Sequence, residues 1–165
     1  MQQQQQQQQQ GNGGHSDFVA AVLITFDPSA DAGLREQAQA YCNAIASSED
    51  GWQLCLAKLN EVALNRGSDH VKFWCLMVIE NIADKRYHTM SQESKDVLRR
   101  SLMLFVRDVI PAVPQPGHIK NKLCAIIVRI VKHDYPAAWP TFFSSVALSR
   151  TRACPRLRCC DSTRC

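Results

Sequence analysis

The chain has 165 residues, 45% of them hydrophobic, which is enough for one domain with a buried core. Its formal net charge of +4 is uneven: residues 1–145 hold 14 Lys and Arg against 14 Asp and Glu, whereas residues 146–165 hold five Arg and one Asp. No apolar run approaches the roughly 18 residues of a membrane span, and no signal-peptide pattern opens the chain. These features argue against membrane insertion. They favour a reducing compartment, in which the eight cysteines remain thiols.

Residues 1–16, MQQQQQQQQQGNGGHS, form a low-complexity leader rich in Gln and Gly. Such a segment buries too little apolar area to offset the conformational entropy that it would lose on folding. We therefore predict that residues 1–16 are disordered. A glutamine tract can also act as an interaction or aggregation element, but a neutral leader is the favoured interpretation.

From residue 17 onward, apolar residues recur at spacings of three and four, which is the period of amphipathic helices. Proline, glycine and capping residues divide this region into six predicted helices. In chain order they cover 17–26, 31–47, 50–65, a helix capped by Ser68 or Asp69, a helix from Ser91 that ends before Pro111, and 118–134. Each of the last five helices has a predicted inward-facing stripe. The second helix contributes Leu34, Ala38, Tyr41, Cys42 and Ile45, and the third contributes Trp52, Cys55, Leu56, Leu59 and Ala63. The stripe of the fourth is Val71, Trp74, Cys75, Val78, Ile79 and Ile82, that of the fifth is Leu98, Leu102, Phe105 and Val109, and that of the sixth is Ile119, Leu123, Ile126, Ile127 and Ile130.

The connections between these helices decide the predicted architecture. No segment alternates apolar and polar residues for long enough to indicate a strand, so the predicted class is all-α. Short connections make consecutive helices antiparallel neighbours. Three antiparallel helical hairpins in a row fit a HEAT-repeat-like α-solenoid at least as well as a closed bundle. We expect Trp52, Trp74, Phe105 and Ile127 to be buried.

The sequence offers no catalytic or metal-binding constellation. No phosphate-binding loop, dinucleotide fingerprint, GxSxG or HExxH motif occurs, so neither an enzyme nor a cofactor is expected. Four cysteines on the predicted stripes are expected to fill the core: Cys42, Cys55, Cys75 and Cys124. Four more lie close together near the end but lack a CxxC pair, so a fortuitous cluster is favoured over a zinc site: Cys154, Cys159, Cys160 and Cys165.

The segment HDYPAAWPTFF, residues 133–143, places Pro136 and Pro140 directly after a strongly apolar helix. Each proline should break a helix, because it lacks the N–H group and its ring collides with the preceding turn. The longer stretch IKNKLCAIIVRIVKHDYPAAWPTFF, residues 119–143, resembles the N-terminal HEAT-repeat region of the importin-β/exportin superfamily. The resemblance implies that Pro136 ends one helix, that Trp139 enters the seam between repeats, and that Pro140 lies in the first turn of the next helix.

Within that superfamily, two further stretches are similar to the tRNA-exportin family. They are DGWQLCLAKL, residues 50–59, and SDHVKFWCLMVIENIADKRY, residues 68–87. The similarity covers residues 17–146. It implies a nuclear export receptor that shuttles between nucleus and cytoplasm, with Ran-GTP, tRNA and nuclear pore proteins as partners.

The resemblance also suggests a binding surface. In this superfamily the second helices of the first repeats line the concave surface that grips Ran-GTP. The candidate Ran-binding residues on two such helices here are Lys72, Asn81, Asn121 and Lys122. Lys120, Lys122, Arg129 and Lys132 are also expected to place positive charge on the exposed face of the sixth helix. Without the resemblance, such residues indicate only a solvated face.

Residues 147–165 depart from the family pattern. They end in SRTRACPRLRCCDSTRC, which has no helical period, so we expect an unstructured or non-native tail from a truncated or frame-shifted product. Such a product would expose the seam meant for the next repeat and would self-associate. It would also lack cooperative binding of tRNA and Ran-GTP. An alternative function remains: a small helical adaptor whose basic tail binds nucleic acid or acidic proteins.

Overall fold

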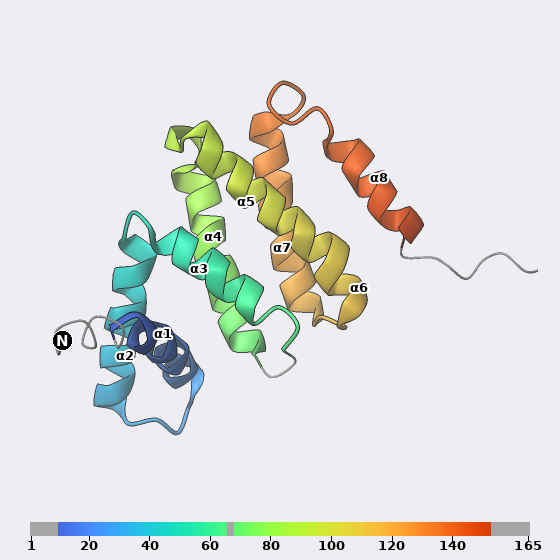
Figure 1. The fold of residues 1–165 in the computed structure, drawn as a ribbon. Helices are drawn as coiled ribbons and strands as arrows, with labels where there is room; N and C mark the ends of the chain where they lie inside the picture. Colours follow the sequence, from blue (N-terminus) through green and yellow to red (C-terminus); the bar gives the residue numbers. More distant parts are fainter. Residues whose placement is uncertain (1–9, 66–67, 153–165) are drawn as a thin grey trace, which may run out of the picture.

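The computed structural model describes residues 10–65 and 68–152, and the regular structure within those ranges is entirely helical (Figure 1). The first hairpin consists of α1 (Gln10–Phe26) and α2 (Ala32–Ser47), and the second of α3 (Gly51–Glu61) and α4 (Asp69–Lys85). A short 3-10 helix, η1 (Tyr87–Thr89), leads to the third, which pairs α5 (Gln92–Leu104), η2 (Phe105–Val109) and α6 (Ile110–Ala112) with α7 (Gly117–Asp134). Helix α8 (Phe142–Arg152) follows. The predicted all-α, HEAT-like array of three antiparallel hairpins is confirmed.

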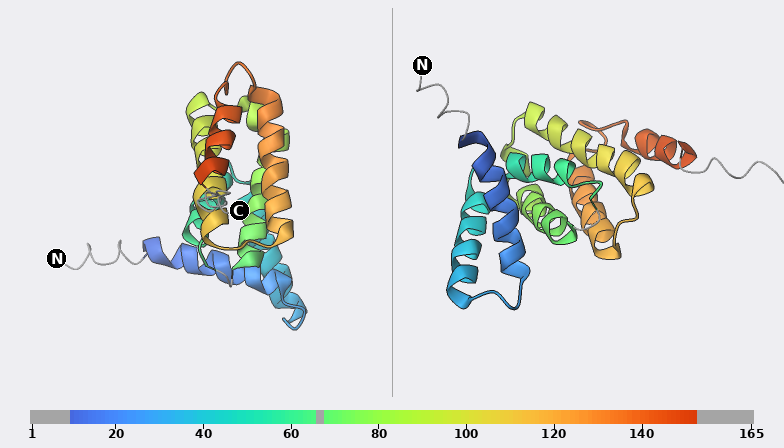
Figure 2. Two further views of the ribbon diagram at one scale, coloured as in Figure 1. Left: turned by 90° about the vertical axis from the view of Figure 1, so that its right-hand side faces the viewer. Right: turned by 60° about the horizontal axis from the view of Figure 1, so that its bottom comes forward.

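Successive hairpins stack through equivalent helices, as Figures 1 and 2 show. Helices α3 and α5 run side by side, and α4 and α7 pack together on the other side of the same layer. The first hairpin joins the second mainly through α1, which crosses α4. There Phe18 meets Trp74 edge to face, with ring centroids 5.2 Å apart. The array is therefore held by contacts between hairpins as well as within them.

One continuous cluster of buried hydrophobic side chains forms the core. Trp52, Trp74, Phe105 and Ile127 are all buried, as predicted. Every predicted inward residue of α3, α4 and α7 is buried too. On these helices the apolar period predicted the buried residues correctly, because neighbouring helices cover each stripe on both sides.

The cysteine prediction is confirmed for Cys42, Cys55 and Cys75 and is wrong for Cys124, which is exposed. Cys124 directly follows the buried Leu123 on α7. One residue turns an α-helix by about 100°, which carries Cys124 off the buried stripe. Its sulfur therefore faces away from the core.

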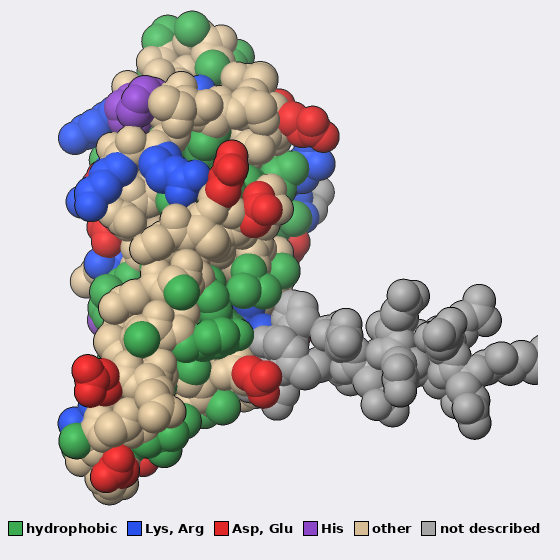
Figure 3. Space-filling model, turned by 90° about the vertical axis from the view of Figure 1, so that its left-hand side faces the viewer, with side chains coloured by type: hydrophobic (Ala, Val, Ile, Leu, Met, Phe, Trp, Pro, Cys, Tyr) green, Lys and Arg blue, Asp and Glu red, His purple; other side chains and the backbone are tan. Residues whose placement is uncertain are grey.

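The stripe on α2 is covered less completely than its period suggested. Ala38 and Cys42 are buried, whereas Leu34 is 47% exposed and Tyr41 is 39% exposed. Helix α2 forms the outer edge of the array and packs chiefly against α1, so only one side of its stripe is covered. Figure 3, which looks onto this end of the molecule, shows hydrophobic side chains across the middle of the surface, with most charged groups above and below.

Several helix starts follow the predicted capping chemistry. Asp31 accepts hydrogen bonds from the backbone N–H groups of Gly33 and Leu34 and so caps α2. Ser91 accepts one from Ser94 N–H and caps α5. Ser68 occupies the N-cap position of α4, but its hydroxyl donates instead to the carbonyl oxygens of the preceding turn. It therefore holds the α3–α4 connection rather than the end of the helix.

The two ends of the helical region differ from the predicted boundaries. Helix α1 begins at Gln10, seven residues before Asp17, and α8 continues to Arg152, six residues past Val146. Once a turn is formed, each added residue gains a backbone hydrogen bond without a new nucleation cost. The rest of the leader, residues 1–9, and the four tail cysteines lie outside the described residues.

Pro111 does not end the fifth helix. The π-helical turn η2 precedes it, and Ile110 N–H donates to the carbonyl oxygen of Phe105, five residues back. This wider turn displaces the carbonyl groups that a proline ring would otherwise strike. The helix continues through α6 to Ala112.

The proline-rich segment agrees with the family resemblance at Pro136 and Trp139 but not at Pro140. Pro140 lies in the turn before α8 and not in its first turn, because the helix opens one residue later with the hydrogen bond from Ser145 N–H to the carbonyl oxygen of Thr141. Helix α7 ends at Asp134, before Pro136, and α8 begins at Phe142, after Pro140. Between them Trp139 is partly buried against the core cluster and meets Phe142 edge to face at 4.9 Å. The segment is a sharp turn anchored by a partly buried aromatic side chain.

Candidate interaction surface

Helices α4 and α7 present one shared surface, which we call the α4–α7 face. The two helices pack side by side along most of their length (Figures 1 and 2). The exposed or partly exposed residues that define this face are Met77, Glu80, Asn81, Asp84, Asn121, Lys122, Val128 and Arg129. Three of the four predicted Ran-binding residues belong to it. The fourth, Lys72, does not.

Asn81 and Asn121 are exposed, one on each helix. Neither belongs to the buried residues of its helix, so both amides are available to a partner. Lys122 is partly buried, because its stem lies beside α4 and its ammonium sits 5.4 Å from the centre of the Phe73 ring. The face thus combines two accessible amides with a cation already engaged within the molecule.

Glu80 lies at the centre of the α4–α7 face. Its carboxylate accepts a hydrogen bond of 2.6 Å from Lys122 Nζ and another from Arg129 Nη1. Arg129 also contacts Asp84, with Nε to Oδ1 at 2.7 Å. One carboxylate on α4 is therefore shared by two cations on α7, and this ion-pair network ties the second hairpin to the third.

The pKa of Glu80 reflects this arrangement. Burial alone would raise it, but the hydrogen bonds and charges of Lys122 and Arg129 outweigh burial and lower the pKa below the ordinary value of 4.5. Glu80 is therefore charged throughout the neutral range. Sequence reasoning missed Glu80 and Asp84, because no local spacing reveals a partner more than 40 residues away.

Lys72 lies in the interior with 1% of its surface exposed. Its Nζ donates to the carbonyl oxygen of Asn65 at 2.7 Å and to Gln115 Oε1 at 3.2 Å, and it lies 3.7 Å from Asp69 Oδ1. Burial lowers the pKa of Lys72 despite the nearby carboxylate. The expectation that Lys72 contacts a partner protein is therefore wrong. Its side chain is buried, and its ammonium group is hydrogen-bonded to other parts of the same chain.

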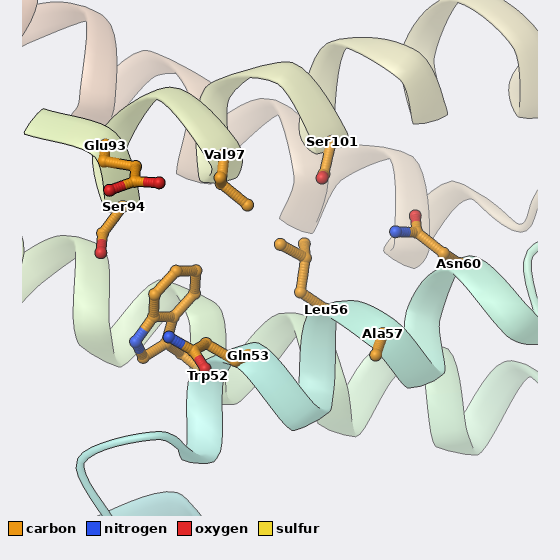
Figure 4. A pocket seen from close by; sticks show the side chains of 9 residues that line it. All are labelled: Trp52, Gln53, Leu56, Ala57, Asn60, Glu93, Ser94, Val97 and Ser101. Atoms are coloured by element: carbon orange, nitrogen blue, oxygen red, sulfur yellow. The ribbon is translucent and has the colours of Figure 1, made fainter.

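A groove lies on the opposite side of the layer. It has a volume of about 520 Å³ and runs between α3 and α5 (Figure 4). Trp52, Leu56 and Val97 supply its apolar surface, and Glu93 supplies one carboxylate. The neutral side chains that complete its lining are Gln53, Ala57, Asn60, Ser94 and Ser101. None of the predicted Ran-binding residues lines it.

Two kinds of feature are absent from the residues that the structure describes. Among residues 10–65 and 68–152, no helix is both long enough and apolar enough to span a bilayer. Within the same ranges, no three His, Cys, Asp or Glu side chains are arranged to hold a metal ion.

Comparison with known proteins gives a consistent result. A family model described as exportin 1-like protein matches residues 116–156, which include α7, the proline-rich turn and α8. Over 127 residues the chain is 32% identical to Exportin-T of Dictyostelium discoideum, covering 77% of this chain and 11% of that protein. Exportin-T of Danio rerio is 31% identical over 125 residues, covering 75% of this chain and 13% of that protein.

The similarity extends to plants. Exportin-T of Arabidopsis thaliana is 28% identical over 135 residues, which is 77% of this chain and 13% of that protein. The chain thus spans 11 to 13% of the length of these relatives. The matched region, the helical array and the proline-rich turn agree with one another, and the chain belongs to the exportin family, in which it corresponds to a segment of the exportin-T sequences.

Proposed function

We propose that this chain is the Ran-GTP-binding part of a nuclear export receptor for tRNA. The observation that carries the proposal is the similarity to Exportin-T over about three quarters of the chain, in relatives as distant as an amoeba, a fish and a plant. The proposed region is residues 17–146, although the family match continues to residue 156. In this role the chain is a transport receptor and not an enzyme. It moves between nucleus and cytoplasm and meets nuclear pore proteins on the way.

The α4–α7 face is the proposed Ran-GTP surface. It offers the exposed amides of Asn81 and Asn121, and it carries Met77 and Val128 with 43% and 52% of their surfaces exposed. A mixture of apolar side chains, amides and cations is common at protein–protein interfaces. Lys122 can contribute only if a partner's acidic group competes with Glu80 for its ammonium.

The direct test is binding of the full chain to Ran loaded with a non-hydrolysable GTP analogue or with GDP, measured by calorimetry. We expect binding to the GTP form. Asn81→Arg and Asn121→Arg should each weaken it at least tenfold by adding bulk and charge to the face, which is about 1.4 kcal/mol. Gln53→Arg, on the opposite side of the layer, is the matched control. Equal affinity for both nucleotide forms, or no effect of either Asn variant, would contradict the assignment.

The tRNA part of the proposal has a separate test. Export receptors bind cargo and Ran-GTP together, and by linkage each ligand strengthens the other by the same coupling free energy. We expect this coupling to be absent for the 165-residue chain alone, because cooperative wrapping requires more repeats than three hairpins provide. The measurement is Ran-GTP affinity with and without tRNA. A strong cooperative effect would contradict this expectation.

The adaptor alternative predicts a different pattern of binding. Five arginines in residues 150–164 would give salt-sensitive affinity for nucleic acid or acidic proteins. Deleting residues 147–165 should leave Ran-GTP binding in place if the α4–α7 face is the site. Loss of all binding on deletion, together with no binding to Ran-GTP, would support the adaptor.

A further inference from the structure

Arg99 on α5 is a buried arginine at the junction of three segments. It is 5% exposed. Its Nη1 donates to Asp134 Oδ2 at 2.7 Å and to the carbonyl oxygen of Ala138 at 3.0 Å, and its Nη2 pairs with Asp96 on the same helix. The carbon of its guanidinium group lies 5.6 Å from the centre of the Trp139 ring. One side chain therefore contacts both the end of α7 and the turn that follows it.

Asp134 links this junction to the preceding hairpin. It is 6% exposed and accepts a hydrogen bond from the hydroxyl of Tyr87, which lies in η1 between the second and third hairpins. Its backbone carbonyl accepts from the N–H groups of Ala138 and Trp139 at 2.7 and 3.0 Å. Asp134 therefore joins two successive inter-hairpin turns, which lie at the same edge of the array (Figure 1).

The groups are in ionisation states that suit this geometry. Burial, and then the hydrogen bond to Asp134, raise the pKa of Tyr87, so its hydroxyl remains a donor. Arg99 remains cationic and balances Asp134 in the interior. A buried charged network of this kind is costly to desolvate, but when its hydrogen bonds are made it permits few alternative arrangements.

Residues of this turn also contact the start of α8. Trp139 meets Phe142 at 4.9 Å, and Tyr135 meets Phe143 at 5.0 Å. Both phenylalanines belong to the first turn of α8. The path from α5 to α8 is therefore continuous, and it runs from the guanidinium of Arg99 through the indole of Trp139 to Phe142.

We propose that Arg99, with Asp134 and Tyr87, is a positioning latch that sets the direction in which α8 leaves the third hairpin. The apolar contacts of Trp139 supply burial but no fixed direction, whereas the paired hydrogen bonds of Arg99 to Asp134 and Ala138 fix the turn in two places. The latch does not depend on the proposed binding of Ran-GTP. It determines where any segment beyond α8 begins, and so the curvature of a longer array.

The test uses the full chain labelled with 5-fluorotryptophan, whose three ¹⁹F resonances report Trp52, Trp74 and Trp139 separately. The deciding variant is Arg99→Met with Asp134→Asn, which removes both charges, keeps similar volumes and leaves an acceptor for Tyr87. We expect the Trp139 resonance to move toward that of the free amino acid. Amide exchange in residues 139–147 should accelerate at least tenfold. The Trp52 and Trp74 resonances should stay in place.

Two companion variants separate positioning from general stability. Arg99→Lys retains the charge but not the paired donors, so it should shift Trp139 part of the way. Arg107→Met removes an exposed arginine of η2 and should move none of the three resonances. The proposal is overturned if the double variant leaves Trp139 and residues 139–147 unchanged. It is also overturned if all three tryptophan resonances move together, because that would show global loosening.

Discussion

Lys72 Nζ and Gln115 Oε1 lie 3.2 Å apart in the interior, although 43 residues separate the two side chains. This hydrogen bond joins α4 to the connection that precedes α7, and Lys72 also reaches the α3–α4 connection through Asn65. Lys72 is thus a cross-link between the second and third hairpins.

Lys72→Met should lower the free energy of unfolding by about 1–3 kcal/mol at neutral pH, because it removes a charged donor from buried acceptors while keeping most of the stem. Urea unfolding followed by circular dichroism measures the change. Lys85→Met, at an exposed position of the same helix, is the control and should have little effect. A variant as stable as the parent would show that the cross-link contributes nothing.

The difference in stability between the parent and Lys72→Met should also depend on pH. The pKa of Lys72 is lowered by burial, so with rising pH the folded chain releases this proton before the unfolded chain does. Between the lowered pKa and the ordinary value of 10.5, the unfolded state binds more protons, and stability contributed by this group must rise with pH. We expect the stability difference between the parent and Lys72→Met to grow as pH approaches 10.5 from neutrality. A difference that shrinks in this window would contradict the assigned burial of the amine.

Glu80→Gln should affect stability in acid and binding at neutral pH. The pKa of Glu80 is lowered in the fold, so its contribution is present above about pH 4.5 and is lost as pH falls through the folded value. We expect a loss of about 0.5–1 kcal/mol at neutral pH and low salt, and no difference from the parent in strong acid. The variant also frees Lys122, so Ran-GTP affinity should rise if Lys122 is a contact. Unchanged affinity would remove Lys122 from the proposed surface.

Trp74→Ala should destabilise the chain by about 3–5 kcal/mol, through lost burial and a residual cavity. Trp74 is 7% exposed and forms the edge-to-face contact with Phe18 that joins the first hairpin to the second. Leu64→Ala, where the leucine is 62% exposed, is the control and should cost far less. The measurement is the midpoint of denaturant unfolding for both variants. Similar midpoints for the two would mean that the first hairpin is not held by this contact.

Two glycines should respond in opposite directions to alanine. A Cβ atom on Gly51 would lie 1.9 Å from the carbonyl oxygen of Ile45, which belongs to the backbone at the end of α2. A Cβ atom on Gly117 would meet no atom within 4 Å. Gly51→Ala should therefore cost about 1–3 kcal/mol by overpacking, and Gly117→Ala should gain about 0.4–1 kcal/mol by restricting the unfolded chain. Thermal unfolding that ranks the two variants in the reverse order would refute the close approach of α2 and α3.

The helices and most of their buried faces could be predicted from sequence because both depend on local period and capping. The exceptions depend on neighbours far along the chain. Lys72 and Lys122 both appeared to be surface lysines, yet one is enclosed between hairpins and the other is paired with Glu80. Leu34 is exposed because α2 lies at the edge of the array, and no feature of its own stripe shows this.

The candidate surface was predictable only in outline. The family resemblance selected the helices α4 and α7 and the residues Asn81 and Asn121, which are exposed. It could not indicate that Glu80 shares two cations of α7, since that contact requires the relative placement of two hairpins. Single-sequence patterns specify which face of a helix is polar, whereas the partner of each polar group is set by tertiary structure.

The π-helical turn at η2 has a consequence for variation in chain length. Its hydrogen bond from Ile110 to Phe105 spans one residue more than an α-helical turn. Removing one residue between them would close an ordinary turn and leave the helices on either side facing as they do now, provided that Pro111 is also replaced by a residue whose side chain does not strike the preceding turn. Related chains can therefore differ by one residue at this point while Leu102 and the residues after Ile110 keep their orientation, whereas a one-residue change inside α7 would rotate everything beyond it by about 100°.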